Sequence, residues 1–209
     1  MHDTKEARKR SVDSLQRLYT VVVSLAVTEA LRRLLSSGTG DYTRWLIFAS
    51  FVVTVVPFYH GANRHLDVSY VTEERKAKPG ALMIDFVFLF IEGILFFALA
   101  VRIDSRDIFY TLLAVLFLLD VFWIGFTYIS RTNEEDRASG YVKWAIMNLV
   151  AGAAIGVSIW SNIFGSFWAN ETAKDVALVS ITISRTVLDY ILQWHFYYPP
   201  EEKSPSVLA

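Results

Sequence analysis

The sequence predicts an all-α integral membrane protein, a bundle of six transmembrane helices. Of its 209 residues, 54% are hydrophobic and 20% are charged, whereas soluble domains average about 45–50% apolar and about 25% charged residues. Six apolar stretches of about 20 residues, the length that crosses a bilayer, occupy nearly the whole chain. A separate soluble domain is therefore not expected, and the net charge of −1 gives no reason to expect nucleic-acid binding.

Turn signals mark the first three predicted spans. The charged segment 1–14 precedes the first span, 15–35, which is followed by the turn sequence Ser-Ser-Gly-Thr-Gly. The second span, 44–61, contains Pro57, which is expected to kink the helix because proline lacks a backbone N–H. The third span, 81–101, is entered through a Pro-Gly pair.

The last three predicted spans complete a transmembrane domain over residues 15–198. The fourth span is 107–129, and the fifth, 141–164, carries Asn148 as a candidate interhelical hydrogen-bonding residue. Gly152 and Gly156 in this fifth span have the spacing that permits close helix approach, within the bundle or across a homo-oligomer interface. The sixth span, 174–198, is ended by two prolines, and the polar tail 199–209 is predicted to be disordered.

The distribution of positive charge predicts the orientation. If the N-terminus is cytoplasmic, most of the 20 Lys and Arg residues fall on the cytoplasmic side, as the positive-inside rule requires. Both termini are therefore predicted to be cytoplasmic, in a multi-pass protein of the plasma or inner membrane with lipid as its surroundings. Aromatic residues near the span ends, Trp144 and Tyr197 among them, are interpreted as interfacial anchors.

Charged residues within the apolar spans are the feature most relevant to function. Each charge at bilayer depth costs at least about 2.5–3.5 kcal/mol on insertion scales, so such residues are normally paired, water-facing or functional. Glu29 precedes Arg32 and Arg33 by three and four residues, and we expect these arginines to neutralise it. The residues concerned are Glu29, Asp85, Glu92, Asp120, Arg185 and Asp189.

Four of these charges are expected to form one cluster near the middle of the bilayer. At a rise of about 1.5 Å per residue, Glu92, Asp120 and Arg185 lie at similar depths. Asp189 follows Arg185 by four residues, so the two can pair within their helix. Three acids then face one base, so at least one carboxylate must be protonated or must meet water or a cation. The alternative is a buried ion-pair network that fixes helix packing and transports nothing.

A second candidate site lies where the second span ends. His60, Asn63 and Arg64, together with Asp85 of the third span, are interpreted as the cytoplasmic mouth of a pathway, with Asp85 orienting His60. A metal site built from His60, His65 and a carboxylate is one alternative. Simple capping of the helix, with basic side chains on lipid phosphates, is another.

These patterns favour a small transporter or channel linked to protons or cations, with a small ion or small molecule as its substrate. The alternative is a membrane-embedded enzyme or lipid-handling protein that uses His60, His65 and Asp85 for acid–base chemistry on the cytoplasmic side. A membrane anchor or signalling subunit without chemistry is a further alternative. The chain lacks cysteine and the common nucleophile, zinc-protease and nucleotide-binding motifs, so no catalytic residue, cofactor or metal is predicted.

Overall fold

The computed structural model describes residues 2–36, 42–72, 80–130, 140–160, 168 and 170–199, and these ranges contain helices and no strand. Six long helices and two short ones follow one another along the chain. Their bounds are α1 (His2–Ser36), α2 (Tyr42–Asp67), the π-helix η1 (Val68–Thr72), α3 (Ala81–Val101), α4 (Arg106–Ser130), α5 (Gly140–Trp160), α6 (Glu171–Leu192) and α7 (Trp194–Tyr197).

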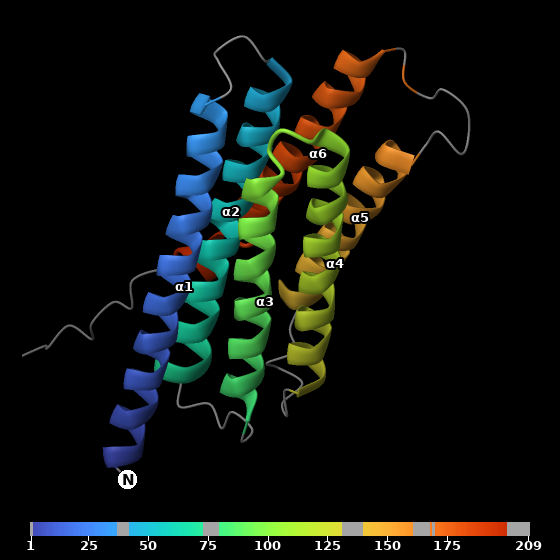
Figure 1. Cartoon of the computed structure of the whole chain (residues 1–209). Coiled ribbons are helices and arrows are strands. Elements are labelled where there is room, and N and C mark those ends of the chain that lie inside the picture. Colours follow the sequence, from blue (N-terminus) through green and yellow to red (C-terminus); the bar gives the residue numbers. More distant parts are fainter. Residues whose placement is uncertain are drawn as a thin grey trace, which may run out of the picture.

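The six long helices run up and down and form a closed ring (Figure 1). The main contacts between elements place the helices in the order α1, α3, α4, α5, α6, α2, and α2 returns to α1. We call the end at which α1 begins the proximal end and the opposite end the distal end. Because the ring closes, one face of every long helix is directed toward a common interior, where Phe58, Phe96 and Phe117 pack on one another.

The predicted helices agree with the structure in position, with differences at their ends. The span 81–101 coincides with α3, whereas α1 begins at His2 and includes residues 2–14, which were predicted to precede the first span. Helix α2 continues beyond Gly61 to Asp67. Gly61 lies close to α7, since a Cβ at this position would lie 3.3 Å from the Tyr197 hydroxyl. The last span divides at Gln193, whose side-chain amide donates to the Gly140 carbonyl oxygen at 2.8 Å. Residues 161–164 of the fifth predicted span and 200–209 of the tail lie outside the described residues.

Pro57 shows how the sequence ties α2 to α6. Proline cannot donate a hydrogen bond to the carbonyl four residues earlier, which here belongs to Val53. The Thr186 hydroxyl of α6 donates to this Val53 carbonyl oxygen at 2.6 Å. A freed backbone carbonyl is thus satisfied by a neighbouring helix, as is required where no water is at hand.

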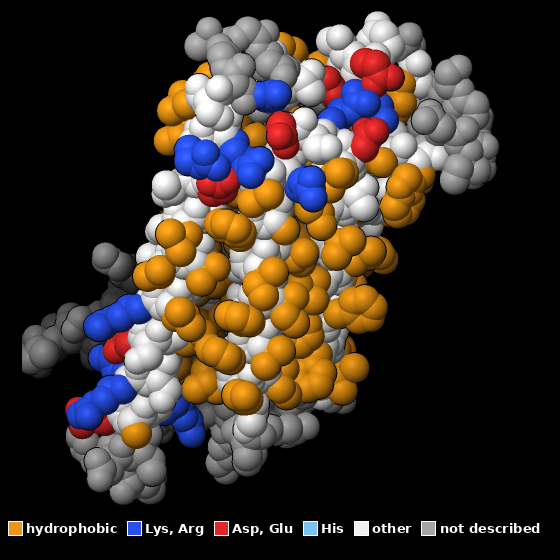
Figure 2. Space-filling model, viewed as in Figure 1, with side chains coloured by type: hydrophobic (Ala, Val, Ile, Leu, Met, Phe, Trp, Pro, Cys, Tyr) orange, Lys and Arg blue, Asp and Glu red, His pale blue; other side chains and the backbone are white. Residues whose placement is uncertain are grey.

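Four helices are long and apolar enough to cross a membrane: α2 with η1, α3, α4 and α5. Figure 2 shows a broad band of apolar side chains around the middle of the molecule, with charged side chains gathered toward its two ends. Many large hydrophobic side chains of the long helices are exposed, among them Phe122 of α4 at 72% and Val150 of α5 at 61%. These features indicate a membrane protein, since a water-soluble surface rarely exposes an apolar patch of this extent.

Two glycines allow helices to approach closely within the ring. Gly93 of α3 faces α1, where a Cβ would meet Cγ1 of Val22 at 2.6 Å. Gly152 of α5 faces α4, where a Cβ would lie 3.5 Å from the Ala114 carbonyl oxygen. Gly152 is therefore used inside the bundle, whereas a Cβ at Gly156 would meet only Trp160 of its own helix. The homo-oligomer interface predicted from the spacing of Gly152 and Gly156 stays a prediction.

The contact at Gly93 gives a stability prediction. Gly93→Ala should force α1 away from α3 and lower the free energy of unfolding by about 1–3 kcal/mol, the usual cost of overpacking. The matched control is Gly125→Ala in α4, where nothing lies within 4 Å of the added methyl group. Thermal unfolding of the detergent-solubilised chain measures both variants. Adding Val22→Ala should restore the stability of Gly93→Ala, and a Gly93→Ala variant as stable as the wild type would contradict this packing.

Candidate functional site

The interior of the ring carries a polar cluster, which we call the central cluster, to which five of the six long helices contribute side chains. On one side, the Tyr19 hydroxyl of α1 donates a hydrogen bond to Oε1 of Glu92 on α3. On the other, the Asn148 side-chain amide of α5 donates to Oδ2 of Asp120 on α4. Glu92 is 4% exposed, and Asp120 is partly buried. Both carboxylates are therefore held by neutral donors.

Arg185 of α6 is held in a fixed position within the central cluster. Its Nε donates to Oδ1 of Asn148 at 2.8 Å, and its Nη1 lies 3.0 Å from Oδ2 of Asp189. The guanidinium carbon lies 4.8 Å from the centre of the Phe58 ring and 5.5 Å from that of Phe117, which adds a cation–π attraction on two sides. The predicted pairing of Arg185 with Asp189 is thus confirmed. Nη1 makes no hydrogen bond of good geometry to any described residue.

Asp189 connects the central cluster to the proximal end. Its Oδ1 accepts a hydrogen bond from the Trp144 indole, and its Oδ2 accepts one from the Tyr197 hydroxyl at 3.2 Å. The Tyr197 ring lies 4.7 Å, centre to centre, from the ring of His60. Trp144 and Tyr197, interpreted from the sequence as interfacial anchors, therefore also hold a buried carboxylate.

A small cavity joins the members of the central cluster. Its volume is about 20 Å³, and the side chains that line it include those of Glu92, Asp120, Arg185, Asp189 and Tyr197. A second space, too narrow for a water molecule and also lined by Glu92 and Asp120, extends between α3 and α4. The four charged residues that were expected from the sequence to form one cluster thus line one cavity, and Glu92 and Asp120 face both spaces.

The charges of the central cluster do not balance within the described part of the chain. Arg185 pairs with Asp189, and neither Glu92 nor Asp120 has an ion pair with a described residue. Asn148 lies between Arg185 and Asp120 and hydrogen-bonds to both, so the guanidinium and the carboxylate do not meet directly. Two carboxylates consequently lack a cationic partner, which agrees with the excess of acid expected from the sequence.

Asp85 lies in a separate polar site at the proximal end, and its imidazole partner is His65, not His60. Nε2 of His65 lies 3.1 Å from Oδ2 of Asp85, which also accepts a hydrogen bond from the Tyr70 hydroxyl at 2.6 Å. The Trp123 indole donates to Oδ1 at 2.9 Å. The expectation that Asp85 orients His60 was wrong because α2 continues as a helix past Gly61, which brings the residue five positions later toward α3.

The remaining residues of the expected proximal mouth have local partners. Arg64 donates to the Phe196 carbonyl oxygen at 2.9 Å and pairs with Asp67 at 3.1 Å. The Asn63 side-chain amide donates to the Tyr59 carbonyl oxygen of the preceding turn. Arg64 thus ties α2 to α7, and the structure does not bring Asn63 and Arg64 to the cavity that the central cluster lines.

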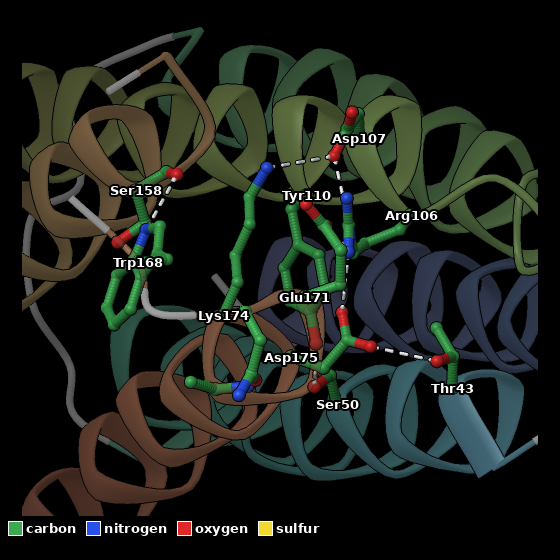
Figure 3. A network of polar contacts seen from close by, with 12 residues as sticks. Thr43, Ser50, Arg106, Asp107, Tyr110, Ser158, Trp168, Glu171, Lys174 and Asp175 are labelled. Atoms are coloured by element: carbon green, nitrogen blue, oxygen red, sulfur yellow. Dashed lines mark hydrogen bonds and ion pairs between the residues drawn. The ribbon is translucent and has the colours of Figure 1, made fainter. Parts of the chain in front are cut away.

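A third network, shown in Figure 3, closes the distal end of the ring. Arg106 of α4 pairs with Glu171 at 2.6 Å and with Asp175 at 3.2 Å, both on α6. The Thr43 hydroxyl of α2 donates to the other oxygen of Asp175 at 2.8 Å. Ser50 of α2 and Tyr110 of α4, both buried, hydrogen-bond at 2.8 Å. Helices α2, α4 and α6 are therefore fastened together on the distal side of the central cluster.

Glu29 lies at the distal end of α1 and has the partners expected from the sequence. Nε of Arg32 lies 2.8 Å from Oε2 of Glu29, and Nε of Arg33 lies 2.6 Å from Oε1. Glu29 is thus neutralised on its own helix and does not belong to the central cluster.

Comparisons with known proteins add no assignment. No protein-family model matches the chain, and no curated protein or solved structure is significantly similar to it. Within the described ranges, no group of three or more His, Cys, Asp or Glu residues is arranged to hold a metal ion. The metal site considered for His60 and His65 therefore has no support among these residues.

The polar site around Asp85 gives a further stability prediction. Trp123→Phe should remove one of three donors to a carboxylate that is 4% exposed, and should lower the free energy of unfolding by about 1–3 kcal/mol. The control is Trp160→Phe, an exposed tryptophan, which should have little effect. Denaturation in detergent provides the measurement, and equal stability of the two variants would show that the indole bond to Asp85 contributes nothing.

Proposed function

We propose that this protein is a small multi-pass transporter or channel in which Glu92 and Asp120 take up protons or small cations from the central cavity. The observation that carries the proposal is the placement of these two carboxylates on one cavity with neutral hydrogen-bond donors and no ion pair among the described residues. A network that served packing alone would be expected to pair its charges, because an uncompensated buried charge is strongly destabilising.

The size of the cavity favours an ion over a larger substrate. Small-molecule pockets usually enclose about 300–1,000 Å³, whereas the larger of the two spaces here has a cavity volume of about 20 Å³, which is room for about one water molecule. The apolar side chains Phe58 and Trp123 supply part of this lining, which leaves little polar surface for recognition of an organic molecule.

The enzyme alternative has less support. His65 is 3% exposed and Asp85 is 4% exposed, and both oxygens of Asp85 already accept hydrogen bonds. A general base must reach the proton that it abstracts, and a membrane lipid has no evident access to this pair.

The proposal includes six spans, with both ends of the transmembrane domain on the cytoplasmic side. Helices α1 and α6 carry more polar residues than the other four, but each presents an exposed apolar stripe that suits contact with lipid. The exposed residues of these stripes are Leu18, Val21, Leu25, Leu31 and Leu35 on α1, and Val176, Ile183, Val187, Leu188 and Ile191 on α6.

The six-span topology can be tested by labelling, because the chain has no cysteine of its own. Single variants Ser11→Cys, near the start of α1, and Thr172→Cys, at the start of α6, place one thiol at each end of the bundle. A membrane-impermeant maleimide added to intact cells should label Thr172→Cys, and should label Ser11→Cys only after permeabilisation. Labelling of both, or of neither, in intact cells would contradict the proposed topology.

Transport is tested in liposomes that contain the purified full-length chain. Under an imposed pH gradient or membrane potential, the wild type should show flux of protons or monovalent cations. Glu92→Gln and Asp120→Asn should abolish it, because each removes an ionisable group that lines the cavity. Glu29→Gln, the matched control, should keep the flux, since Glu29 is paired at the end of α1. The same background leak in wild type and variants would refute the proposal.

A further inference from the structure

We infer that the ion bound in the central cavity is the proton, that Glu92 and Asp120 are its binding groups, and that Arg185 is the residue that keeps metal cations out. The inference rests on the proposed function, which leaves the choice between protons and small cations open. It follows from the ligands that the cavity offers and from the position of the guanidinium.

The cavity does not offer the ligands that a metal cation requires. Hard cations take several oxygen ligands, about six to eight for calcium, and potassium filters are built from rings of backbone carbonyls. Around Glu92 and Asp120, the other side chains lining the smaller space are those of Phe58, Phe88, Leu116, Leu119 and Trp123, none of which supplies an oxygen ligand. The larger space adds the oxygens of Asp189 and Tyr197, which are already engaged: Asp189 pairs with Arg185 and accepts hydrogen bonds from the Trp144 indole and the Tyr197 hydroxyl. The backbone carbonyls there belong to continuous helices and are already hydrogen-bonded within them.

Each of the two carboxylates has one oxygen engaged and one available. Tyr19 donates to Oε1 of Glu92, and Asn148 donates to Oδ2 of Asp120. Oε2 of Glu92 and Oδ1 of Asp120 accept no hydrogen bond from the described residues. A proton needs a single oxygen: hydronium entering the cavity transfers a proton to this free oxygen, an O–H bond forms, and water is left.

Arg185 already occupies the position of a cation in this cavity. Its contacts with Asn148, Asp189 and the Phe58 ring fix the guanidinium, so it cannot withdraw to make room for a second positive charge. Repulsion between like charges is strong where water is scarce. When three carboxylates and one guanidinium are all charged, the central cluster carries a net charge of −2. Two protons bound to Glu92 and Asp120 neutralise this charge without placing a second cation next to the guanidinium.

Few ionisable or charged side chains lie close enough to Glu92 and Asp120 to affect how these two carboxylates titrate. Glu92 faces Tyr19, which stacks on Tyr59 at a centre-to-centre distance of 5.8 Å. Across the cavity, Glu92 and Asp120 face each other and the Arg185–Asp189 pair, to which Tyr197 donates a hydrogen bond. The ionisable side chain of His60 lies beyond Tyr197.

Infrared spectroscopy of the full-length protein in a maltoside detergent, which has no carbonyl group, tests proton binding directly. The carbonyl stretch of a protonated carboxyl group is separate from the amide bands and shifts in D₂O. The wild type should show this band with a pH dependence that Na⁺ or K⁺ does not change. Glu92→Gln and Asp120→Asn should each lose a part of it, and the control Glu29→Gln should retain all of it. A band that is absent, unaffected by both variants or sensitive to Na⁺ or K⁺ would overturn the inference.

The role of Arg185 is tested with two substitutions. In Arg185→Gln, which removes the charge, Na⁺ or K⁺ should compete with the proton and shift the pH titration of the band. In Arg185→Lys, which keeps the charge, the titration should remain insensitive to these cations. If both variants unfold cooperatively like the wild type and neither titration responds to Na⁺ or K⁺, Arg185 does not exclude metal cations. If Arg185→Gln does not fold, the wild-type titration in Na⁺ and K⁺ still decides between proton and metal cation.

Liposome flux separates this inference from the proposed function. If the carboxyl bands behave as expected but the liposomes show no flux, the proposal of transport is refuted and the proton-binding site is supported. Flux of Na⁺ or K⁺ without a protonated carboxyl band would support transport and refute the proton as the bound ion.

Discussion

The arrangement of the whole bundle depends on how the guanidinium of Arg185 is held. A charged arginine in the interior of an apolar bundle is tolerated only with good partners. Asn148 of α5, Asp189 of α6 itself and the Phe58 ring of α2 supply them, so one side chain couples three neighbouring helices of the ring. Asn148 is the critical member, because its amide separates the guanidinium from Asp120 while hydrogen-bonding to both. Glu92 of α3 and Asp120 of α4 are thereby left without an ion pair among the described residues.

Much of the helical architecture could be predicted from the sequence, and the partners inside it only in part. The bounds of α3 and the pairing of Arg185 with Asp189 followed from hydropathy and from i,i+4 spacing, which are local properties. The partners of Asp85 could not be read in this way. Choosing His65 over His60 required knowing which face of α2 is turned toward Asp85 of α3, and this depends on how the helices pack together in three dimensions. The hydrogen bond from Tyr19 to Glu92 could not be predicted, since a tyrosine in an apolar stretch is usually an ordinary packing residue.

The three polar sites of the bundle differ in how completely their charges are satisfied. At the proximal end, Asp85 accepts from three donors, and at the distal end Arg106 meets two carboxylates of α6. In the central cluster between them, Glu92 and Asp120 have no ion pair with a described residue and line a small cavity. Fastened ends and an unbalanced middle suit a protein whose helices keep their packing while the charge in its interior changes.

The position of α6 in the ring also bears on how the protein is made. Helix α6 lies between α2 and α5, and both precede it in the chain. In the proposed six-span topology, an isolated α6 would carry Arg185 and Asp189 into lipid, each at a cost of at least about 2.5–3.5 kcal/mol. Its polar face meets Asn148, Trp144 and the Val53 carbonyl only when its neighbours are in place. In that topology we therefore expect α6 to enter the membrane last among the long helices and to close the ring by packing between α5 and α2, which are already in place.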